Sequence, residues 1–344
     1  MAYISFKPKD YYNTVTYTGN GSAGNGITGV GFQPDWVWIK RRESGSHNLV
    51  DVVRGVNVAV ASESSGAQGT YSNNLSAFGT DGFTLGNGSL VNANAGTYVS
   101  YNWRAGNSQG SSNTDGSINT TYTSVNTTAG FSISKWTGTG SAGTIGHGLG
   151  AVPKFIIVKN VDSNNDWNVY HHKTGNEYRS FLNTTAARED NASAWNDTSP
   201  TSSVFSIGTN TNVNQSGQSI IAYAFAEKRG FSSMGYYKAN GNADGTFIYT
   251  GFKPAYVLIK NYESSQSWYV YNDKTKGFNT ENDYVQPDTN SSENSDTDQI
   301  DILSNGFKLR STDGGTNGNN FDHIYVAFAS EPLVSSNNIP STAR

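Results

Sequence analysis

The chain of 344 residues has no cysteine, only two methionines, and few charges, with Asp, Glu, Lys and Arg making up 15% of it. The absence of cysteine excludes a disulfide scaffold and any Cys-ligated zinc or iron–sulfur site. No apolar run approaches the roughly 18 residues of a membrane-spanning helix, and the first residues hold no signal-peptide-like apolar stretch. The net charge is −4, so a basic phosphate-binding surface is disfavoured. We therefore expect neither a membrane nor a nucleic-acid partner.

The composition is instead rich in turn-forming and aromatic residues. There are 38 Gly and 40 Asn, and aromatic residues make up 12% of the chain. Gly and Asn favour tight turns, whereas Tyr, Phe and Trp favour strands. Disordered chains lack aromatics, so this content indicates a folded protein with real cores. We expect an all-β fold and find no convincing helix.

A threefold internal repeat is the most informative feature. Each copy contains a Gly and a Pro that lead into a four-residue apolar run, and it closes with a second apolar segment. The leading runs are 36–39, 155–158 and 256–259, and the closing segments are 98–103, 220–225 and 324–328. A continuous run of aromatic and β-branched residues is typical of a strand that is buried on both faces. The sequence therefore predicts three tandem copies of an antiparallel β-sandwich or jelly-roll-like domain of about 100 residues.

The repeat also sets the expected domain limits. These are an N-terminal arm plus the first copy at 1–106, a Gly/Ser/Asn-rich linker at 107–125, a second copy at 126–229, a third copy at 231–332 and a C-terminal tail at 333–344. A propeller is disfavoured, because its blades would repeat every 40–50 residues. We expect three rigid domains in a row, forming a rod or a knob.

Two familiar patterns do not carry their usual chemistry here. The GxGxxG pattern at 19–24 and 138–143 is followed by more glycine and a Pro-led strand, where a dinucleotide site needs a helix. A glycine-rich hairpin turn explains it better. His171 and His172 point to opposite faces of a strand and cannot easily chelate one ion. We expect the histidines on the surface. HExxH and GxSxG motifs are absent, and we predict that the protein is not an enzyme.

An acidic segment at 281–301 contains no Lys or Arg. Clustered carboxylates could bind Ca²⁺ around Asp296, Asp298 and Asp301, although the EF-hand spacing is missing. A solvated loop insertion is the favoured alternative. No cofactor is otherwise expected, and nothing fixes two carboxylates at the separation that a glycosidase needs.

Side chains that recur in the copies allow two interpretations. Trp167, Tyr170, Trp268 and Tyr271 could contact a glycan, but aromatics at matching positions of several copies favour a shared core role. A basic and an acidic residue also recur after the leading run, and we expect them to pair across a turn. The expected pairs are Lys40 with Glu43, Lys159 with Asp162 and Lys260 with Glu263.

Several segments resemble a known family. They are 4–10 running into 17–21, 29–40 with 52–55, 80–86 followed by 98–103, 146–153, 167–171 and the closing 328–333. These segments resemble a repeated domain of unknown function in structural proteins of tailed bacteriophages, especially marine and cyanobacterial ones. The resemblance covers nearly the whole chain. It implies a virion component and carries over no catalytic residue.

We therefore expect a non-enzymatic virion structural protein displayed on the particle exterior, as a capsid decoration, head fibre or tail fibre. The alternative is a glycan-binding adhesin that recognises host surface polysaccharide. A polysaccharide-degrading enzyme has no positive signal. The expected partners are other capsid or tail proteins. The chain is also expected to form a homo-oligomer, and a trimer is favoured. In the adhesin alternative, a host surface glycan is a further partner. The expected location is the virion, assembled in the host cytoplasm.

Overall fold

The computed structural model describes residues 7–276, 279 and 283–329. The expected C-terminal tail at 333–344 and the first six residues of the N-terminal arm lie outside this part. The described chain is built almost entirely of antiparallel strands, which confirms the all-β prediction. The described helices, which the sequence did not reveal, are short. They are the 3-10 turn η1 (Pro8–Asp10) and the α-helices α1 (Ser89–Asn92), α2 (Ala192–Trp195), α3 (Thr211–Asn214) and α4 (Gly314–Asn317). No helix in the described residues is long enough to cross a bilayer.

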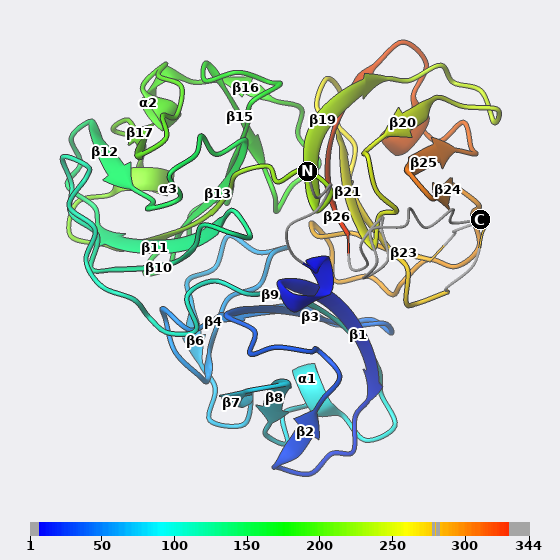
Figure 1. Ribbon diagram of the computed structural model, residues 1–344, viewed down its shortest axis with the longest axis horizontal. Helices are drawn as coiled ribbons and strands as arrows, with labels where there is room; N and C mark the ends of the chain where they lie inside the picture. Colours follow the sequence, from blue (N-terminus) through cyan, green and yellow to red (C-terminus); the bar gives the residue numbers. More distant parts are fainter. Residues whose placement is uncertain (1–6, 277–278, 280–282, 330–344) are drawn as a thin grey trace.

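Three lobes surround a common centre in Figure 1, drawn in blue to cyan, in green and in yellow to orange. We define lobe 1 as residues 7–106, lobe 2 as 107–229 and lobe 3 as 230–329. Lobe 1 has a large sheet of order β1-β9-β3-β4, a small sheet of order β2-β8-β7 and the pair β5-β6. Its strands are β1 (Tyr12–Thr18), β2 (Asn25–Ile27), β3 (Trp36–Arg41), β4 (His47–Asp51), β5 (Val58–Ala59), β6 (Gly69–Thr70), β7 (Leu75–Gly79), β8 (Gly82–Leu85) and β9 (Thr97–Trp103).

Lobe 2 is also built from a large and a small sheet. The large sheet has the order β10-β11-β18-β13-β14-β15-β16, and the small one is the pair β12-β17. The strands are β10 (Tyr122–Asn126), β11 (Phe131–Thr137), β12 (Gly143–Gly146), β13 (Phe155–Asn160), β14 (Asn168–His171), β15 (Tyr178–Phe181), β16 (Glu189–Asp190), β17 (Val204–Ile207) and β18 (Ser219–Phe225).

Lobe 3 follows the same plan, with a large sheet of order β19-β26-β21-β22-β23 and a small sheet of order β20-β25-β24. Its strands are β19 (Ser232–Lys238), β20 (Phe247–Tyr249), β21 (Tyr256–Asn261), β22 (Trp268–Asn272), β23 (Tyr284–Val285), β24 (Ile300–Leu303), β25 (Gly306–Leu309) and β26 (Asp322–Phe328). The predicted leading runs are thus the start of β3, β13 and β21, and the closing segments lie in β9, β18 and β26.

Each large sheet is covered on both faces. In β3, Trp36 and Trp38 belong to a core shared by the three lobes, whereas Val37 and Ile39 belong to the core of lobe 1 alone. Successive side chains of a strand point to opposite faces, so one apolar run can serve two cores. The same alternation occurs in β13 and β21. This arrangement confirms the strands buried on both faces that the sequence predicted.

The shared core joins the lobes through aromatic rings. The ring of Trp36 stacks on Tyr223 of lobe 2, with centroids 4.2 Å apart, and on Trp103, with centroids 4.6 Å apart. Tyr12 meets Tyr256 and Phe328 of lobe 3 at 5.8 and 5.4 Å. The lobes therefore close around one centre and do not form the expected row of separate domains. The physical reason is that each large sheet has a second apolar face, and only the other lobes cover it.

The expected linker at 107–125 is folded onto lobe 2. Ser111 forms an antiparallel bridge with Thr123, and Ile118 forms a parallel bridge with Ile145 of β12. The end of the segment enters β10, which pairs with β11. This stretch is therefore part of the lobe and leaves no free connection between lobes 1 and 2.

Candidate functional site

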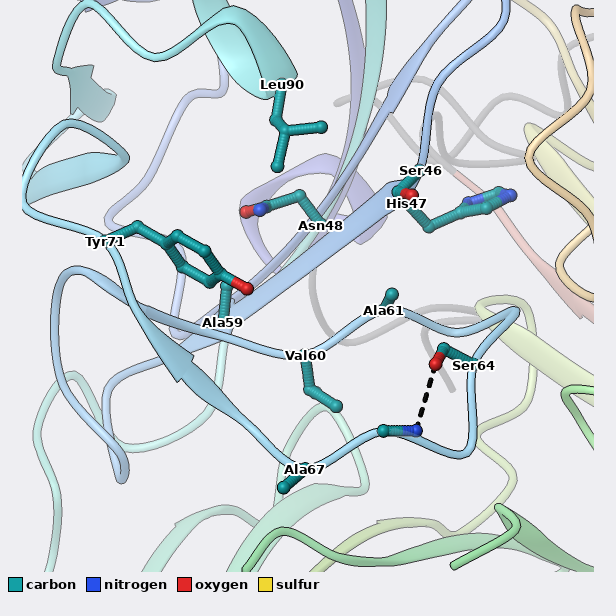
Figure 2. A pocket seen from close by; sticks show the side chains of 11 residues that line it. Ser46, His47, Asn48, Ala59, Val60, Ala61, Ser64, Ala67, Tyr71 and Leu90 are labelled. Atoms are coloured by element: carbon teal, nitrogen blue, oxygen red, sulfur yellow. Dashed lines mark hydrogen bonds between the residues drawn. The ribbon is translucent and has the colours of Figure 1, made fainter. Parts of the chain in front are cut away.

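A hollow of about 160 Å³ in lobe 1 is shown in Figure 2. It lies between the start of β4, the β5–β6 pair and α1. Its rim holds Tyr71 and Leu90, whose side chains are 43% and 39% exposed. Ser46, His47, Asn48 and Ser64 add polar side chains to its lining.

The histidine of this hollow is engaged elsewhere. Figure 2 shows its ring directed away from Tyr71 and Leu90. Trp38 Nε1–H donates to His47 Nδ1 at 2.8 Å, and His47 Nε2 lies 3.0 Å from the carbonyl oxygen of Gln286. These bonds fit a neutral ring with the proton on Nε2. Burial lowers the pKa of His47 to about 3, so the ring does not act as a base toward the hollow.

The serines of the hollow also bond within the fold, whereas the buried Asn48 Oδ1 has no hydrogen-bond partner in the described chain. The Ser64 hydroxyl accepts the N–H of Gly66 at 2.9 Å. Glu63 accepts the N–H of His47 at 3.2 Å and the hydroxyl of Ser46, and burial raises the pKa of its carboxyl. These contacts close a loop over β4. The arrangement is that of a structural turn beside a shallow surface hollow.

His47 belongs to a cyclic set of contacts between lobes. His47 of lobe 1 reaches Gln286 of lobe 3. Trp167 Nε1–H of lobe 2 donates to the carbonyl oxygen of Ala61 in lobe 1 at 3.0 Å. Trp268 Nε1–H of lobe 3 donates to the carbonyl oxygen of Phe181 in lobe 2 at 2.7 Å. Lobes 2 and 3 thus each form a hydrogen bond with the preceding lobe, and lobe 1 forms one with lobe 3. We call these three contacts the interlobe ring.

The expectation of surface histidines is wrong, since four of the five side chains are buried. They are His47, His147, His171 and His323. His171 Nε2 lies 3.3 Å from the carbonyl oxygen of Tyr325 in lobe 3, and burial lowers its pKa to about 3. Buried neutral imidazoles serve here as hydrogen-bonding links between backbone segments.

All four aromatic side chains proposed as glycan contacts lie inside the protein. Trp167, Trp268 and Tyr271 are at most 1% exposed, and Tyr170 is 4% exposed. The two tryptophans make two of the three contacts of the interlobe ring. Tyr170 packs on Trp195, and the Tyr271 hydroxyl donates to Gln299 Oε1 at 2.5 Å. None of these rings offers a face to a sugar, because neighbouring lobes or the lobe's own core cover them.

The recurring lysines do not form the expected pairs with the nearby carboxylates. Lys159 Nζ donates to the carbonyl oxygens of Ser65 in lobe 1 and of Asn165, at 2.8 and 2.5 Å. Lys260 Nζ likewise donates to the carbonyl oxygen of Thr185 in lobe 2 at 2.9 Å. Burial lowers the pKa of Lys40, Lys159 and Lys260 to about 8. Lys159 and Lys260 are therefore interior links between lobes, whereas Lys40 Nζ donates to the carbonyl oxygens of Arg41 and Glu43 in its own lobe.

The buried lysines predict an unusual pH dependence. Their pKa is about 8 in the folded chain, against an ordinary value of 10.5, so the unfolded chain binds more protons between these values. Stability should therefore rise with pH from about 8 toward 10, by up to about 1.4 kcal/mol per pH unit for each lysine. Buried tyrosines reverse the trend above about pH 10, because burial raises the pKa of groups such as Tyr223.

Urea unfolding at a series of pH values measures this slope. Lys159→Met should make the rise between pH 8 and 9.5 shallower. Lys253→Met, at an exposed position, should keep the wild-type slope. Equal slopes in the two variants would contradict the role assigned to Lys159.

A buried asparagine holds the glycine-rich turn in each lobe. Asn214, at the end of α3, accepts the N–H of Thr139 at 2.9 Å. Its Nδ2 donates to the carbonyl oxygens of Ser141 and Gly208 at 2.7 and 3.0 Å. Asn92 and Asn317 do the same in lobes 1 and 3. These turns connect strands of different sheets, such as β11 and β12, so the hairpin expected at the GxGxxG pattern is wrong.

Asn214→Ala should destabilise the chain by about 2–4 kcal/mol, because three backbone groups, among them the buried carbonyl of Gly208, lose their partner. Chemical unfolding followed by circular dichroism measures the change. Asn212→Ala, in the same helix but partly exposed, is the control and should change stability by less than about 0.5 kcal/mol. Similar losses in both variants would show that the helix, and not the asparagine side chain, is sensitive.

Exposed aromatic side chains gather on the small sheet of lobe 3. Phe247 and Tyr249 of β20 are 43% and 62% exposed. Lys308 lies beside Phe247 on β25, and Asp244 pairs with it at 2.8 Å. We call the surface formed by Phe247, Tyr249, Asp244, Lys308 and Arg310 the lobe 3 outer face. At the places of Phe247 and Tyr249, lobes 1 and 2 have only small residues. Ile27 opposite Phe83 in lobe 1 and Ile145 opposite Phe205 in lobe 2 correspond to Ile248 opposite Phe307 in lobe 3. The residues on either side of these isoleucines are Gly26 and Thr28 in lobe 1, and Thr144 and Gly146 in lobe 2.

A family model described as a domain of unknown function (DUF7483) matches residues 7–332. The chain belongs to this family. The DUF7483 match spans all three lobes, so the family unit includes the shared core and the interlobe ring. No curated protein and no solved structure matches the chain. The family description names no activity, ligand or partner.

In this DUF7483 chain the acidic residues considered for Ca²⁺ are not drawn together. Asp296 and Asp298 are exposed in the loop before β24. Asp301 lies on β24 and pairs with Arg310 Nε at 2.5 Å. Within the described residues, no group of three or more His, Cys, Asp or Glu side chains could hold a metal ion. Calcium binding at this loop stays a prediction.

Sequence reasoning missed three kinds of residue in the DUF7483 chain. The buried asparagines recur nine or ten residues after Phe83, Phe205 and Phe307, so the repeat contained a signal for them. The buried lysines also recur, but Lys159 and Lys260 donate to backbone carbonyls of another lobe, which no spacing reveals. Phe247 and Tyr249 stand out for the opposite reason, because they do not recur.

Proposed function

We propose that the chain is a non-enzymatic structural protein displayed on the exterior of a tailed-bacteriophage particle. The observation that carries this proposal is the shared aromatic core, which joins the lobes into one body. The interlobe ring supports the proposal, because a structural protein on a particle surface must keep its shape and these hydrogen bonds fix the lobes relative to one another. The resemblance of segments such as 29–40 and 80–86 to phage structural proteins supports the phage context.

We also propose that the lobes are three copies of one unit, packed around the shared core and not in a row. The strand orders β1-β9-β3-β4, β11-β18-β13-β14 and β19-β26-β21-β22 are the same at matching positions. Other capsid or tail proteins and further copies of this chain, favoured as a trimer, are the proposed partners.

Mass spectrometry of purified particles and antibody labelling in electron microscopy test the main proposal. We expect the protein in intact particles, with labels on their outer surface. Absence of the protein from purified particles would contradict the proposal, and labelling only after the particles are opened would contradict exterior display.

A glycan-binding adhesin is the second candidate. It is favoured by the exposed rings of Phe247 and Tyr249, since a flat aromatic face with polar neighbours can support a sugar. A glycan array, read with and without Ca²⁺, tests it. Binding that disappears in Phe247→Thr would support the adhesin, and an array without signal would contradict it.

A further inference from the structure

The hollow of Figure 2 lies where lobe 1 has small residues in place of large side chains of lobe 2. Strand register identifies the matching positions. The pairs that align the two lobes are Ile39–Asn48 with Val158–Asn168, Leu49–Val60 with Val169–Ser180, and Ala59–Gly69 with Arg179–Glu189. The corresponding residues are therefore Asn48 and Asn168, Ala59 and Arg179, Ala61 and Phe181, and Gly69 and Glu189.

In lobe 2 this place is filled, and its polar groups are paired. Arg179 Nη1 donates to Asn168 Oδ1 at 3.2 Å, and Arg179 Nη2 donates to both carboxylate oxygens of Glu189 at 3.1 Å. The guanidinium carbon lies 4.8 Å from the ring centre of Phe181. Asn168 Nδ2 donates to the carbonyl oxygen of Asp166 at 3.1 Å. The asparagine of lobe 2 thus has a partner at both ends of its amide.

Lobe 3 closes the same place with aromatic rings. Tyr269 stands at the position of Asn48, and Tyr284 stands at that of Ala59. The centres of the two tyrosine rings are 5.0 Å apart. Lobes 2 and 3 therefore cover this place with their own side chains, whereas lobe 1 leaves it open.

Asn48 lacks the partner that its counterpart has in lobe 2. The residue is only 3% exposed, and its Oδ1 has no hydrogen-bond partner in the described chain. A buried amide oxygen without a partner destabilises the fold, so such groups are rare. Figure 2 shows the Asn48 amide directed into the hollow, between Tyr71 and Leu90. The open space of the hollow is therefore where a partner for this amide can enter.

The lining of the hollow combines an aromatic ring with uncharged polar groups. The Tyr71 ring lies over Gly69, since a Cβ on this glycine would come within 2.5 Å of Tyr71 Cζ. Ser46 and Ser64 add hydroxyl groups. None of the lining residues in the described chain carries a charge, because His47 is neutral. An apolar wall with a few polar groups is the usual make-up of a small-molecule site.

The lost ion pair indicates which ligand suits this lining. A guanidinium like that of Arg179 only donates hydrogen bonds, and its counter-charge in lobe 2, Glu189, is replaced by Gly69. A hydroxyl both donates and accepts, so it can pair with either end of the Asn48 amide and needs no counter-charge. A ring that carries hydroxyls beside an apolar face also matches the exposed ring of Tyr71. Sugars combine these two properties.

We propose that the hollow of lobe 1 binds one neutral sugar ring of a glycan. The sugar packs against Tyr71 and Leu90, and its hydroxyls exchange hydrogen bonds with the Asn48 amide. The volume of about 160 Å³ suits a single ring, since pockets for drug-sized ligands measure roughly 300–1,000 Å³. This site depends neither on exterior display nor on the lobe 3 outer face, so it can fail independently of the proposed function.

Saturation-transfer difference NMR with the full chain tests the site, with the methyl pyranosides of glucose, galactose, mannose and N-acetylglucosamine as probes. We expect saturable binding of at least one probe with a Kd of about 1–10 mM. Asn48→Leu should weaken it at least about tenfold, because the amide is lost. Tyr71→Ala should do the same, whereas Tyr71→Phe keeps the ring and should retain binding within about threefold.

A filled hollow and an unrelated ring provide the controls. Ala59→Arg combined with Gly69→Glu copies the ion pair of lobe 2 into lobe 1 and should abolish binding. Tyr236→Ala removes a ring that is 53% exposed in lobe 3 and should leave binding unchanged. Thermal melts verify that each variant folds. If the double variant does not fold, Ala59→Leu takes its place, because leucine fills the same space without a charge.

Four results would overturn the proposal. The first is the absence of binding by every pyranoside at about 100 mM, which would leave the hollow to water. The second is equal binding by the wild type and the filled variant, which would place the sugar elsewhere. The third is binding of methylguanidinium but of no pyranoside, which would assign the hollow to an arginine side chain of a partner. The fourth is a lower melting temperature of Asn48→Leu, which would show that the amide already has a structural partner.

Discussion

Trp36→Ala is expected to destabilise the whole chain by about 3–5 kcal/mol, because it removes a fully buried ring at the centre of the shared core. The ring contacts Tyr223 of lobe 2 as closely as it contacts its own lobe. The loss should therefore appear in all three lobes at once. Urea unfolding, followed by tryptophan fluorescence and circular dichroism, should give one coincident transition shifted to lower urea.

Hydrogen exchange of the Trp36→Ala variant identifies where stability is lost. Protection should fall by a similar free energy in β3 of lobe 1, β18 of lobe 2 and β26 of lobe 3. Phe205→Ala, in the core of lobe 2 alone, is the matched control for a large cavity outside the shared core. An early transition confined to lobe 1 would show that the lobes are separate domains and would contradict the role of the shared core.

Arg54→Met is expected to cost about 3–5 kcal/mol, because it leaves a buried carboxylate without its counter-charge. Arg54 Nε donates to Asp51 Oδ2 at 2.5 Å, and both side chains are at most 1% exposed. The hydroxyl of Tyr223, from lobe 2, donates to the same oxygen at 2.8 Å. The pair thus lies at the contact between lobes 1 and 2, away from solvent.

The double variant Asp51→Asn with Arg54→Met separates charge from packing. Removing both charges should recover part of the stability that Arg54→Met loses, since no uncompensated carboxylate remains. Denaturant midpoints of the wild type, both single variants and the double variant complete the cycle. Simply additive losses would contradict an interaction between Asp51 and Arg54.

The strands could be predicted from the sequence because their cause is local. The runs that begin at Trp36, Phe155 and Tyr256 are too apolar and too short for anything but strands buried on both faces. What covers the second face is not a local property. The sequence therefore does not show that Trp36 of lobe 1 and Tyr223 of lobe 2 meet in one core.

The residues of the candidate surfaces were harder to predict, for two different reasons. Trp167 and Trp268 are candidate glycan contacts by residue type, whereas their recurrence favours a core role, and the structure places them in the contacts of lobes 2 and 3 with the preceding lobe. Phe247 and Tyr249 carry no repeat signal, because the other lobes lack them. Within a repeated chain, a position that departs from its counterparts is the better indicator of a surface with its own role.

The interlobe ring also bears on how the chain folds as it is synthesised. Its closing contact joins His47 to Gln286, so lobe 1 cannot complete its contacts until most of lobe 3 has left the ribosome. Until then, the inward faces of lobes 1 and 2 lack their cover. Contacts between such distant positions slow folding, and exposed apolar faces invite aggregation. The nascent chain should therefore depend on chaperones until its last third is made.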